Sequence, residues 1–250
     1  MKYAVIVSKK DKAGMNIAKQ LEPMLVNREE IKLFIREEKS IDCENIDKEI
    51  DAEEFIFATK HESASGKPTL SVHFPGNFSK AELGGNDRTL CKANAPLLKA
   101  LYLKLKELHD EVSLEVTHHG PYLEKPCLFI EIGSTEKEWI NEDYGKIIAK
   151  TIAEITSKDI KDCNKVLVGI GGGHYPVNFN KILDRTNYCI GHICPKYQLE
   201  NLNEDLLEQM LLKSNSDEVV VDWKGLGEFK EKVNELLKDR NWKRDKELLR

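Results

Sequence analysis

The chain has 250 residues, 32% of them are charged, and the formal net charge is −5. This length is sufficient to bury a substantial core, and we expect residues 1–250 to form a single α/β domain. The negative charge excludes a global basic field that would draw the protein to DNA. No apolar stretch approaches the roughly 18 residues of a membrane span, and the first apolar run is too short for a signal peptide. We therefore expect a cytoplasmic protein with no membrane partner.

Apolar, β-branched runs alternate with amphipathic helical patterns, which is typical of an α/β protein. The polar, glycine-rich passage at 62–88 is long for a compact domain, and the histidines at 61 and 73 favour a functional role for it. In chain order we expect a strand at 3–8, a helix at 12–25, strands at 31–36, 53–61 and 69–74, a helix at 95–109, strands at 112–118 and 127–132, a helix at 134–156, a strand at 165–170, a helix near 178–185, a strand at 188–193, a helix at 202–212, a strand at 218–223 and a closing helix at 226–239.

The six cysteines, at positions 43, 91, 127, 163, 189 and 194, form no CxxC pair. Several lie in apolar runs, which favours reduced, buried thiols over a disulfide framework. In the segment CIGHIC, strand alternation places Cys189 on the face opposite His192 and Cys194, so we interpret these cysteines as core residues.

Polar side chains gather where the predicted strands end. In open α/β sheets, ligands bind beyond the carboxyl ends of the strands, so these side chains should line a common cleft. Five of the seven histidines lie at or just beyond the ends of predicted strands. Histidines scattered over the surface would not be expected to show this distribution. The strand-end residues are Lys60, His61, His118, His119, Glu131, Ser134, Thr135, Gly171, Gly172, Gly173, His174 and His192.

The segment THHGPYLEKPCLFIEIG holds the most informative of these residues. Because neighbouring strand side chains point to opposite faces, His118 and His119 should not both enter one cleft unless Gly120-Pro121 bends the chain. Glu131 interrupts an apolar run, and a buried carboxylate there costs several kcal/mol unless a histidine, a metal or a water compensates it. Ser134 and Thr135 fit either a helix start or a substrate contact, and Thr135 with Glu138 predicts a capping box.

The segment GIGGGHY follows a predicted strand but lacks the third glycine of a dinucleotide fingerprint, and no helix opens at once. Its amides suit an oxyanion or a phosphate. No HExxH, CxxC pair or GxSxG is present, so the sequence favours water activated by histidine, carboxylate or metal over a serine nucleophile. A zinc site assembled from distant histidines with Glu131 or Asp87 stays open at this point.

Five long motifs follow one another along nearly the whole chain: KHESASGKPTLSVHFPGN, VTHHGP, EIGSTEKEW, GIGGGHY and GHICPKY. In this order they resemble the archaeal and plant type of D-aminoacyl-tRNA deacylase. The resemblance implies an enzyme that hydrolyses the ester between a D-amino acid and tRNA, with D-aminoacyl-tRNA as its partner. We expect the chain to be a monomer. It also implies a three-layer α/β/α fold with a mostly parallel mixed sheet, similar to phosphorylases and hydrolases, and a Zn²⁺ cofactor.

The resemblance also implies roles for individual residues. The catalytic set is His118, His119, Glu131 and His174, and the metal set is His61, His73, His118 and His174. The substrate-binding set is Lys60, Ser63, Asn77, Ser134, Thr135, His192 and Lys196. From the amides of the Gly-rich turn we expect Gly171, Gly172 and Gly173 to bind substrate as well, with the terminal adenosine of tRNA entering over this turn. The segments HES and HYPVNF depart from the family pattern, which puts substrate contacts there in doubt.

Three alternatives stay open. A peptidyl-tRNA hydrolase or a nucleoside phosphorylase-like enzyme could use the same fold, and phosphate dependence would identify the latter. A non-catalytic tRNA-binding module could use the locally basic tail KDRNWKRDKELLR, although the acidic net charge and the lack of interleaved aromatic and basic residues disfavour it.

Overall fold

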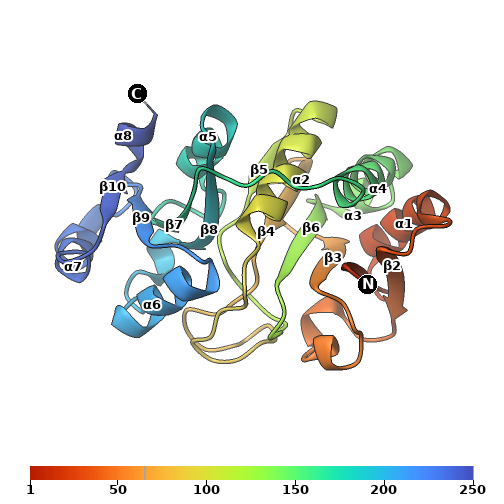
Figure 1. The fold of residues 1–250 in the computed structure, drawn as a ribbon, viewed down its shortest axis with the longest axis horizontal. Helices are drawn as coiled ribbons and strands as arrows, with labels where there is room; N and C mark the ends of the chain where they lie inside the picture. Colours follow the sequence, from red (N-terminus) through yellow and green to blue (C-terminus); the bar gives the residue numbers. More distant parts are fainter. Residues whose placement is uncertain (65, 250) are drawn as a thin grey trace.

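The computed structural model describes residues 1–64 and 66–249, which form a mixed α/β fold with two sheets (Figure 1). Its helices and strands in chain order are β1 (Tyr3–Ser8), α1 (Lys12–Leu21), β2 (Ile31–Arg36), β3 (Glu54–Lys60), β4 (Thr69–His73), α2 (Ala95–Leu108), β5 (Val112–Leu114), β6 (Cys127–Gly133), α3 (Glu136–Trp139), α4 (Glu142–Thr156), β7 (Lys165–Ile170), α5 (Val177–Arg185), β8 (Tyr188–Cys194), α6 (Glu204–Lys213), β9 (Glu218–Val221), α7 (Lys230–Leu236), β10 (Trp242–Arg244) and α8 (Asp245–Leu248).

The larger sheet has six strands in the order β2-β1-β3-β6-β4-β5 and is mostly parallel. β4 runs antiparallel to β6, with Ser71 opposite Glu131. On the other side of β6, Thr59 of β3 also lies opposite Glu131. Glu131 of β6 therefore lies between β3 and β4, and side chains of both strands can reach its carboxylate.

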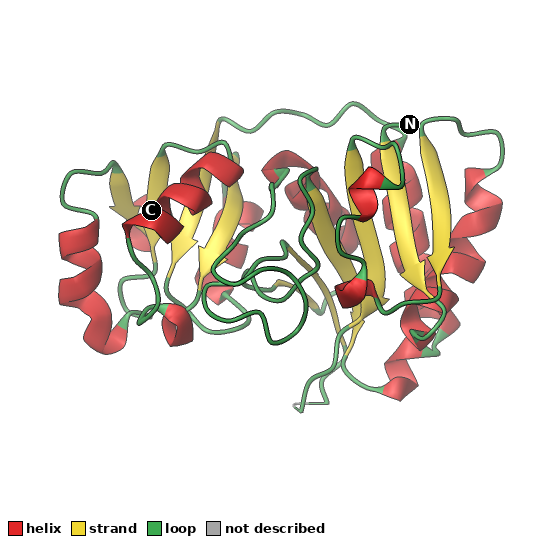
Figure 2. Ribbon diagram, turned by 90° about the horizontal axis from the view of Figure 1, so that it is seen from below, coloured by secondary structure: helices red, strands yellow, loops and turns green. Residues whose placement is uncertain are grey.

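The smaller sheet has four parallel strands in the order β10-β9-β7-β8. The two sheets lie side by side, and the chain termini lie at opposite sides of the molecule (Figure 2). Backbone hydrogen bonds join the segment after β5 to the smaller sheet: Val116 N–H donates to His174 O and Thr117 N–H donates to Ile193 O, both at 3.1 Å. Residues 115–119 are thereby held between the two sheets.

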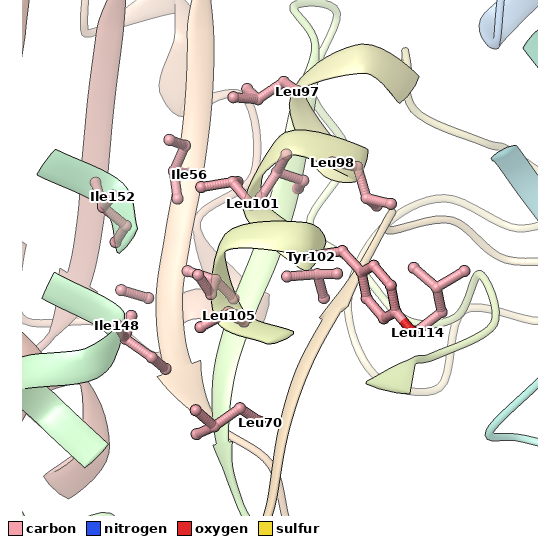
Figure 3. Packing of buried hydrophobic residues seen from close by; sticks show 14 of the residues in the cluster. Ile56, Leu70, Leu97, Leu98, Leu101, Tyr102, Leu105, Leu114, Ile148 and Ile152 are labelled. Carbon is pink, nitrogen blue, oxygen red and sulfur yellow. The ribbon is translucent and has the colours of Figure 1, made fainter. Parts of the chain in front are cut away.

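One face of the larger sheet is covered by α1, α2 and α4. Apolar residues at helical spacing on α2 pack on alternate residues of β3, β4 and β6, and Figure 3 shows Leu101 and Leu105 over this surface. The other face carries a second apolar cluster, which includes the stacked rings of Phe57 and Phe129, covered by 3-10 turns and loops. In the smaller sheet, α5 and α6 lie on opposite faces, which gives that part three layers.

The predicted elements are mostly confirmed, with three corrections. The strand predicted at 112–118 ends at Leu114, because the following backbone bonds to the smaller sheet. The helix predicted at 134–156 divides into α3 and α4, since Asn141 caps a second helix with its side chain on Asp143 N. The tail, for which no element was predicted, forms β10 and α8.

The expectation of reduced cysteines is wrong for one pair. Cys163 and Cys189 form a disulfide, and their Cα atoms are 5.7 Å apart, which is within the usual range for a disulfide. Cys43, Cys91, Cys127 and Cys194 are free and buried, as expected.

Within the described ranges, no helix combines the length and the apolar character needed to cross a lipid bilayer.

The core packing predicts the effect of removing one α2 side chain. Leu101 is fully buried, so Leu101→Ala should lower the free energy of unfolding by about 2–5 kcal/mol through lost contacts and a residual cavity. Leu212 on α6 is 71% exposed, and Leu212→Ala should change stability by less than about 0.5 kcal/mol. Urea unfolding followed by circular dichroism measures both, and equal losses would contradict this packing.

Candidate active site

Polar side chains interrupt the second, loop-covered face of the larger sheet. Strand alternation places Thr59, His73 and Glu131 on the face opposite α1, α2 and α4. Thr59 Oγ1 donates to Glu131 Oε1 at 2.6 Å. The site thus lies on one face of the sheet near the ends of β3 and β6. This corrects the expectation that it lies wholly beyond the strand ends.

Glu115, which the sequence analysis missed, lies at the centre of the site. It follows β5 directly, and its N–H donates to Val72 O of β4 at 3.0 Å, which fixes the backbone beneath the side chain. Its side chain is completely buried, and Glu115 Oε2 accepts a 2.8 Å hydrogen bond from His174 Nε2. A signal was present in the sequence, because Glu115 interrupts the apolar run VSLEV just as Glu131 interrupts CLFIEIG.

His61 lies between the two buried carboxylates. Its Nδ1 is 3.1 Å from Glu115 Oε1 and 3.5 Å from Glu131 Oε2. Burial opposes the charged form, but the two carboxylates outweigh burial and raise the pKa of His61 to about 11. Burial likewise disfavours charged Glu131, but His61 and His73 lower the pKa of Glu131 to about 2. The protonated His61 ring therefore compensates much of the buried negative charge.

Three more histidine rings, His73, His118 and His119, gather beside this ion pair. Their centroids lie 4.3 to 4.9 Å apart. In each ring Nδ1 is within hydrogen-bond distance of a backbone carbonyl: 3.2 Å to Phe74 O, 2.7 Å to Val116 O and 2.6 Å to Gly120 O, respectively. If Nδ1 carries the proton and donates it to this carbonyl, Nε2 lies on the far side of each ring and points away from the backbone.

The charge states of these rings differ. Burial, followed by the neighbouring His73, lowers the pKa of His118 well below its ordinary value and that of His119 to about 4. Burial also opposes a proton on His73, but Glu131 outweighs it and raises the pKa of that ring. His118 and His119 are therefore neutral and can act as acceptors or metal ligands.

His118 and His119 both belong to one cluster of side chains, which also contains His61, His73, His174, Glu115 and Glu131. This placement corrects the expectation that only one of the two adjacent histidines would face the cleft. Because β5 ends at Leu114, the alternation of strand side chains does not apply at His118 and His119. His119 has a left-handed backbone with φ of 47°, so its ring turns back toward His118 instead of pointing to the opposite face.

Other predicted residues lie outside the cluster and have structural partners. Ser134 Oγ donates to Lys67 O, and Thr135 begins α3, where Glu138 accepts from its N–H and its hydroxyl. Ser63 N–H donates to Ser134 O. Asn77 Nδ2 donates to Gly84 O and braces that loop. These contacts favour the helix-start interpretation of Thr135 and give no support to the expected substrate contacts of Ser63, Asn77 and Ser134.

His192 is completely buried away from the cluster. Its Nδ1 is 3.0 Å from Thr117 Oγ1, and its Nε2 is 2.8 Å from Cys91 O. Burial lowers the pKa of His192 to about 4, so the ring is a neutral core residue. This placement corrects the expectation that His192 contacts substrate. Asp87, considered as a zinc ligand, is exposed and accepts from Ala81 N.

Three cavities adjoin the cluster. The first, about 440 Å³, is lined by His119 and Glu131 together with Lys60, whose ammonium lies 4.3 Å above the Trp139 ring. The second, about 160 Å³, reaches His118 and His119. The third, about 720 Å³, is lined by Gly172, Gly173 and Lys196. Buried titratable groups with shifted pKa values beside such cavities are typical of enzyme active sites.

Three sets of side chains in the described part of the chain could hold a metal ion. They are His73, His118 and His119; His61, Glu115 and His174; and His73, Glu115 and Glu131, with donor atoms within 4.8 Å of one another in each set. Within the same part, the buried His73 Nε2 forms no hydrogen bond. An unsatisfied buried nitrogen beside two carboxylates fits a position that accepts a metal ion.

The fold and this cluster define an α/β enzyme with histidine and carboxylate chemistry, and comparison with known proteins specifies the family. The family model described as D-aminoacyl-tRNA deacylase matches residues 48–244. The chain is 37% identical to the D-aminoacyl-tRNA deacylase of Methanocaldococcus jannaschii, with 90% of this chain and 91% of the relative covered. It is 37% identical to the protein of the same name from Pyrococcus furiosus, with 93% and 95% covered.

A solved structure agrees with this result. The crystal structure of the conserved protein of unknown function AF0625 superimposes with a TM-score of 0.93 at 30% identity, covering 99% of this chain and 96% of that one. The chain belongs to the D-aminoacyl-tRNA deacylase family.

The ion-pair geometry predicts how His61 responds to loss of one carboxylate. In metal-free protein, Glu115→Gln should lower the pKa of His61 from about 11, because only Glu131 then holds its proton. Titration of the ring nitrogen shifts by NMR measures this. Glu62→Gln is the matched control, since that carboxylate adjoins His61 in sequence but is 72% exposed and screened by solvent. An unchanged His61 pKa in Glu115→Gln would contradict the geometry.

Proposed function

We propose that the protein hydrolyses the ester bond of D-aminoacyl-tRNA and releases the free D-amino acid and tRNA. Membership of the deacylase family supports the reaction and the substrate. The observation that carries the mechanism is the pairing of His174 with the buried Glu115. A carboxylate that fixes one nitrogen of a histidine leaves the other free to accept a proton, as in the serine protease triad.

His174 is the general base in this proposal. With Nε2 protonated and donating to Glu115, Nδ1 carries the lone pair, and Tyr197 Oη lies 3.4 Å from it. The His174 side chain is 34% exposed, compared with 9% for His61 and none for His73, so water and substrate can reach it. Nδ1 would take the proton of the attacking water and return it to the departing ribose oxygen.

The Gly-rich turn beside His174 supplies donors for the developing oxyanion. Gly171 N–H donates to Cys194 O, so the sequence-based expectation that its amide stabilises an oxyanion is wrong. Among residues 1–64 and 66–249, no protein acceptor receives a hydrogen bond from the backbone N–H of Gly172 or Gly173. Both residues line the largest cavity beside the cluster. Two free amides next to a base favour stabilisation of the tetrahedral intermediate at this turn.

A zinc ion would be held by His73, His118 and His119. The backbone carbonyl at each Nδ1 orients the ring, a support that metal-binding histidines usually have. This set retains His73 and His118 of the sequence-based proposal and replaces His61 and His174 with His119, because those two rings hydrogen-bond Tyr175 and Glu115. Bound zinc would supply Lewis acidity that lowers the pKa of water. His73 would lose its proton on binding.

Two cations of the basic tail are paired with carboxylates of the protein itself. Arg240 pairs with Glu204 and Glu208, and Lys243 pairs with Glu218. These pairs engage two of the cations that the alternative of a tRNA-binding module would use, which makes the catalytic proposal the preferred one. The monomeric state, the cytoplasmic location and the absence of DNA binding stay predictions from the sequence.

The proposed general base is tested by removing its imidazole ring. His174→Ala should reduce kcat for hydrolysis of D-aminoacyl-tRNA by about 10²–10⁴-fold, the usual contribution of a positioned base. The assay measures release of the amino acid from matched D- and L-aminoacyl-tRNA under single turnover. His109→Gln, outside the cluster at the end of α2, is the control and should keep the wild-type rate. A wild-type rate in His174→Ala would eliminate this base.

The proposed zinc ion is tested by removing it and by changing one of its ligands. Exhaustive chelation should remove bound zinc and deacylase activity together, and one added equivalent should restore both. His118→Ala should lower the zinc content measured by mass spectrometry, because one of three ligands is lost. His109→Gln should keep the wild-type zinc content. Full activity in protein shown to be free of metal would contradict the proposal.

A further inference from the structure

The largest cavity beside the cluster lies at the carboxyl ends of the smaller sheet. Three adjacent parallel strands lead into it: β7 continues to Gly172 and Gly173, β8 to Lys196 and β9 to Asp222. In open α/β sheets this edge is where nucleotides and other ligands bind. The volume of about 720 Å³ is within the usual range for small-ligand sites. The cavity therefore has the position and size of a built site.

Asp222 is the distinctive polar group in this cavity. It is 9% exposed, and its Oδ1 accepts a 3.1 Å hydrogen bond from Gly225 N. Among residues 1–64 and 66–249, nothing donates a hydrogen bond to Oδ2, although this atom belongs to a cavity-lining side chain. A carboxylate at the end of the strand next to a Gly-rich turn is the arrangement that accepts a ribose hydroxyl in nucleotide-binding α/β folds.

Glycines around Asp222 keep its carboxylate accessible. A Cβ atom added at Gly225 would lie 2.6 Å from Asp222 Oδ2 and 2.7 Å from Gly172 N. Gly172 has φ of +82°, a conformation that side-chain-bearing residues rarely adopt. The two glycines thus allow the Gly-rich turn, the β9 end and Asp222 to approach one another closely.

Aromatic rings form part of the remaining walls, together with Val177 and Asn178. Tyr175, Tyr197 and Phe229 line the cavity, and Tyr197 is 55% exposed. Exposed or half-buried aromatic rings suit the face of a nucleobase. The charged groups at the rim, Glu200 and Glu228, are acidic, and Lys196 is paired with Glu228 at 3.0 Å. This charge pattern disfavours a phosphate group inside the cavity and favours the uncharged sugar and base of a nucleoside.

Two tyrosines connect this cavity to the catalytic cluster. Tyr175 Oη is 2.6 Å from His61 Nε2, and Tyr197 Oη is 3.4 Å from His174 Nδ1. A ligand that contacts these rings lies next to the proposed general base. An ester on the sugar of a bound nucleoside would therefore be close to His174.

We propose that this cavity binds the 3′-terminal adenosine of the substrate tRNA, with Asp222 accepting a hydrogen bond from the ribose 2′-hydroxyl and with Phe229 and Tyr197 contacting the base. The proposal rests on the proposed deacylase function and extends it to a particular nucleoside subsite. Asp222 and Phe229 are specificity-determining residues in this account, and His174 performs the chemistry.

A chemical double-mutant cycle tests the role of Asp222. Two substrates carry the D-amino acid on the 3′-hydroxyl and end in adenosine or 2′-deoxyadenosine. In the wild type, loss of the 2′-hydroxyl should reduce kcat/KM by about 10- to 100-fold, because a buried carboxylate loses its hydrogen-bond donor. In Asp222→Asn the two substrates should differ by about threefold or less. Asp205→Asn, an exposed aspartate on α6, should retain the wild-type ratio. An equal ratio in the wild type and Asp222→Asn would overturn the proposal.

A binding measurement separates this subsite from the deacylase function. Uncharged tRNA with and without its terminal adenosine is titrated against the protein by filter binding. The wild type should bind the complete tRNA about 5- to 150-fold more tightly, as stacking of one base predicts, and Phe229→Ala should lose most of this difference. If deacylation fails but the adenosine dependence is seen, the subsite is supported and the proposed function is not. If deacylation occurs with no adenosine dependence, the subsite is overturned.

Discussion

The structure depends on the compensation of two buried carboxylates, Glu115 and Glu131. Two negative charges in a protein interior cost many kcal/mol unless cations and hydrogen bonds offset them. His61 lies within 3.5 Å of both, His174 bonds Glu115, and Thr59 bonds Glu131. The contacts that stabilise the carboxylates also raise the pKa of His61 and His73, so folding and the proposed chemistry rest on one network.

This network also explains the arrangement of the two sheets. Glu131 and His61 come from the larger sheet, His174 follows β7 of the smaller sheet, and Glu115 comes from the segment bonded between them. The Gly-rich turn carries both the proposed base and the proposed oxyanion donors, and its other side faces the proposed nucleoside cavity. Chemistry and substrate recognition are thus adjacent because the carboxyl ends of the smaller sheet face the loop-covered side of the larger one.

Local patterns in the sequence predict most of the elements and bring His61, His73 and Glu131 to the candidate site, because these residues lie in or beside strands whose apolar runs are clear. The pattern fails at 115–119. There the backbone bonds to a distant strand, so strand alternation could not place His118 and His119. Glu115 carries the same signal as Glu131, but its partner His174 is 59 residues away, and only tertiary structure brings them together. His192 was predicted to contact substrate because it lies near a strand end, but it is a buried core residue whose Nε2 is bonded to Cys91 O.

The central claim is that Glu115 and His174 act as one unit. The most direct test is a double-mutant cycle on kcat/KM for D-aminoacyl-tRNA with Glu115→Gln, His174→Ala and the double variant. The double variant should lose about as much activity as His174→Ala alone, because Glu115 acts through the histidine. Losses that multiply would show that the two residues act independently and would contradict their action as one unit.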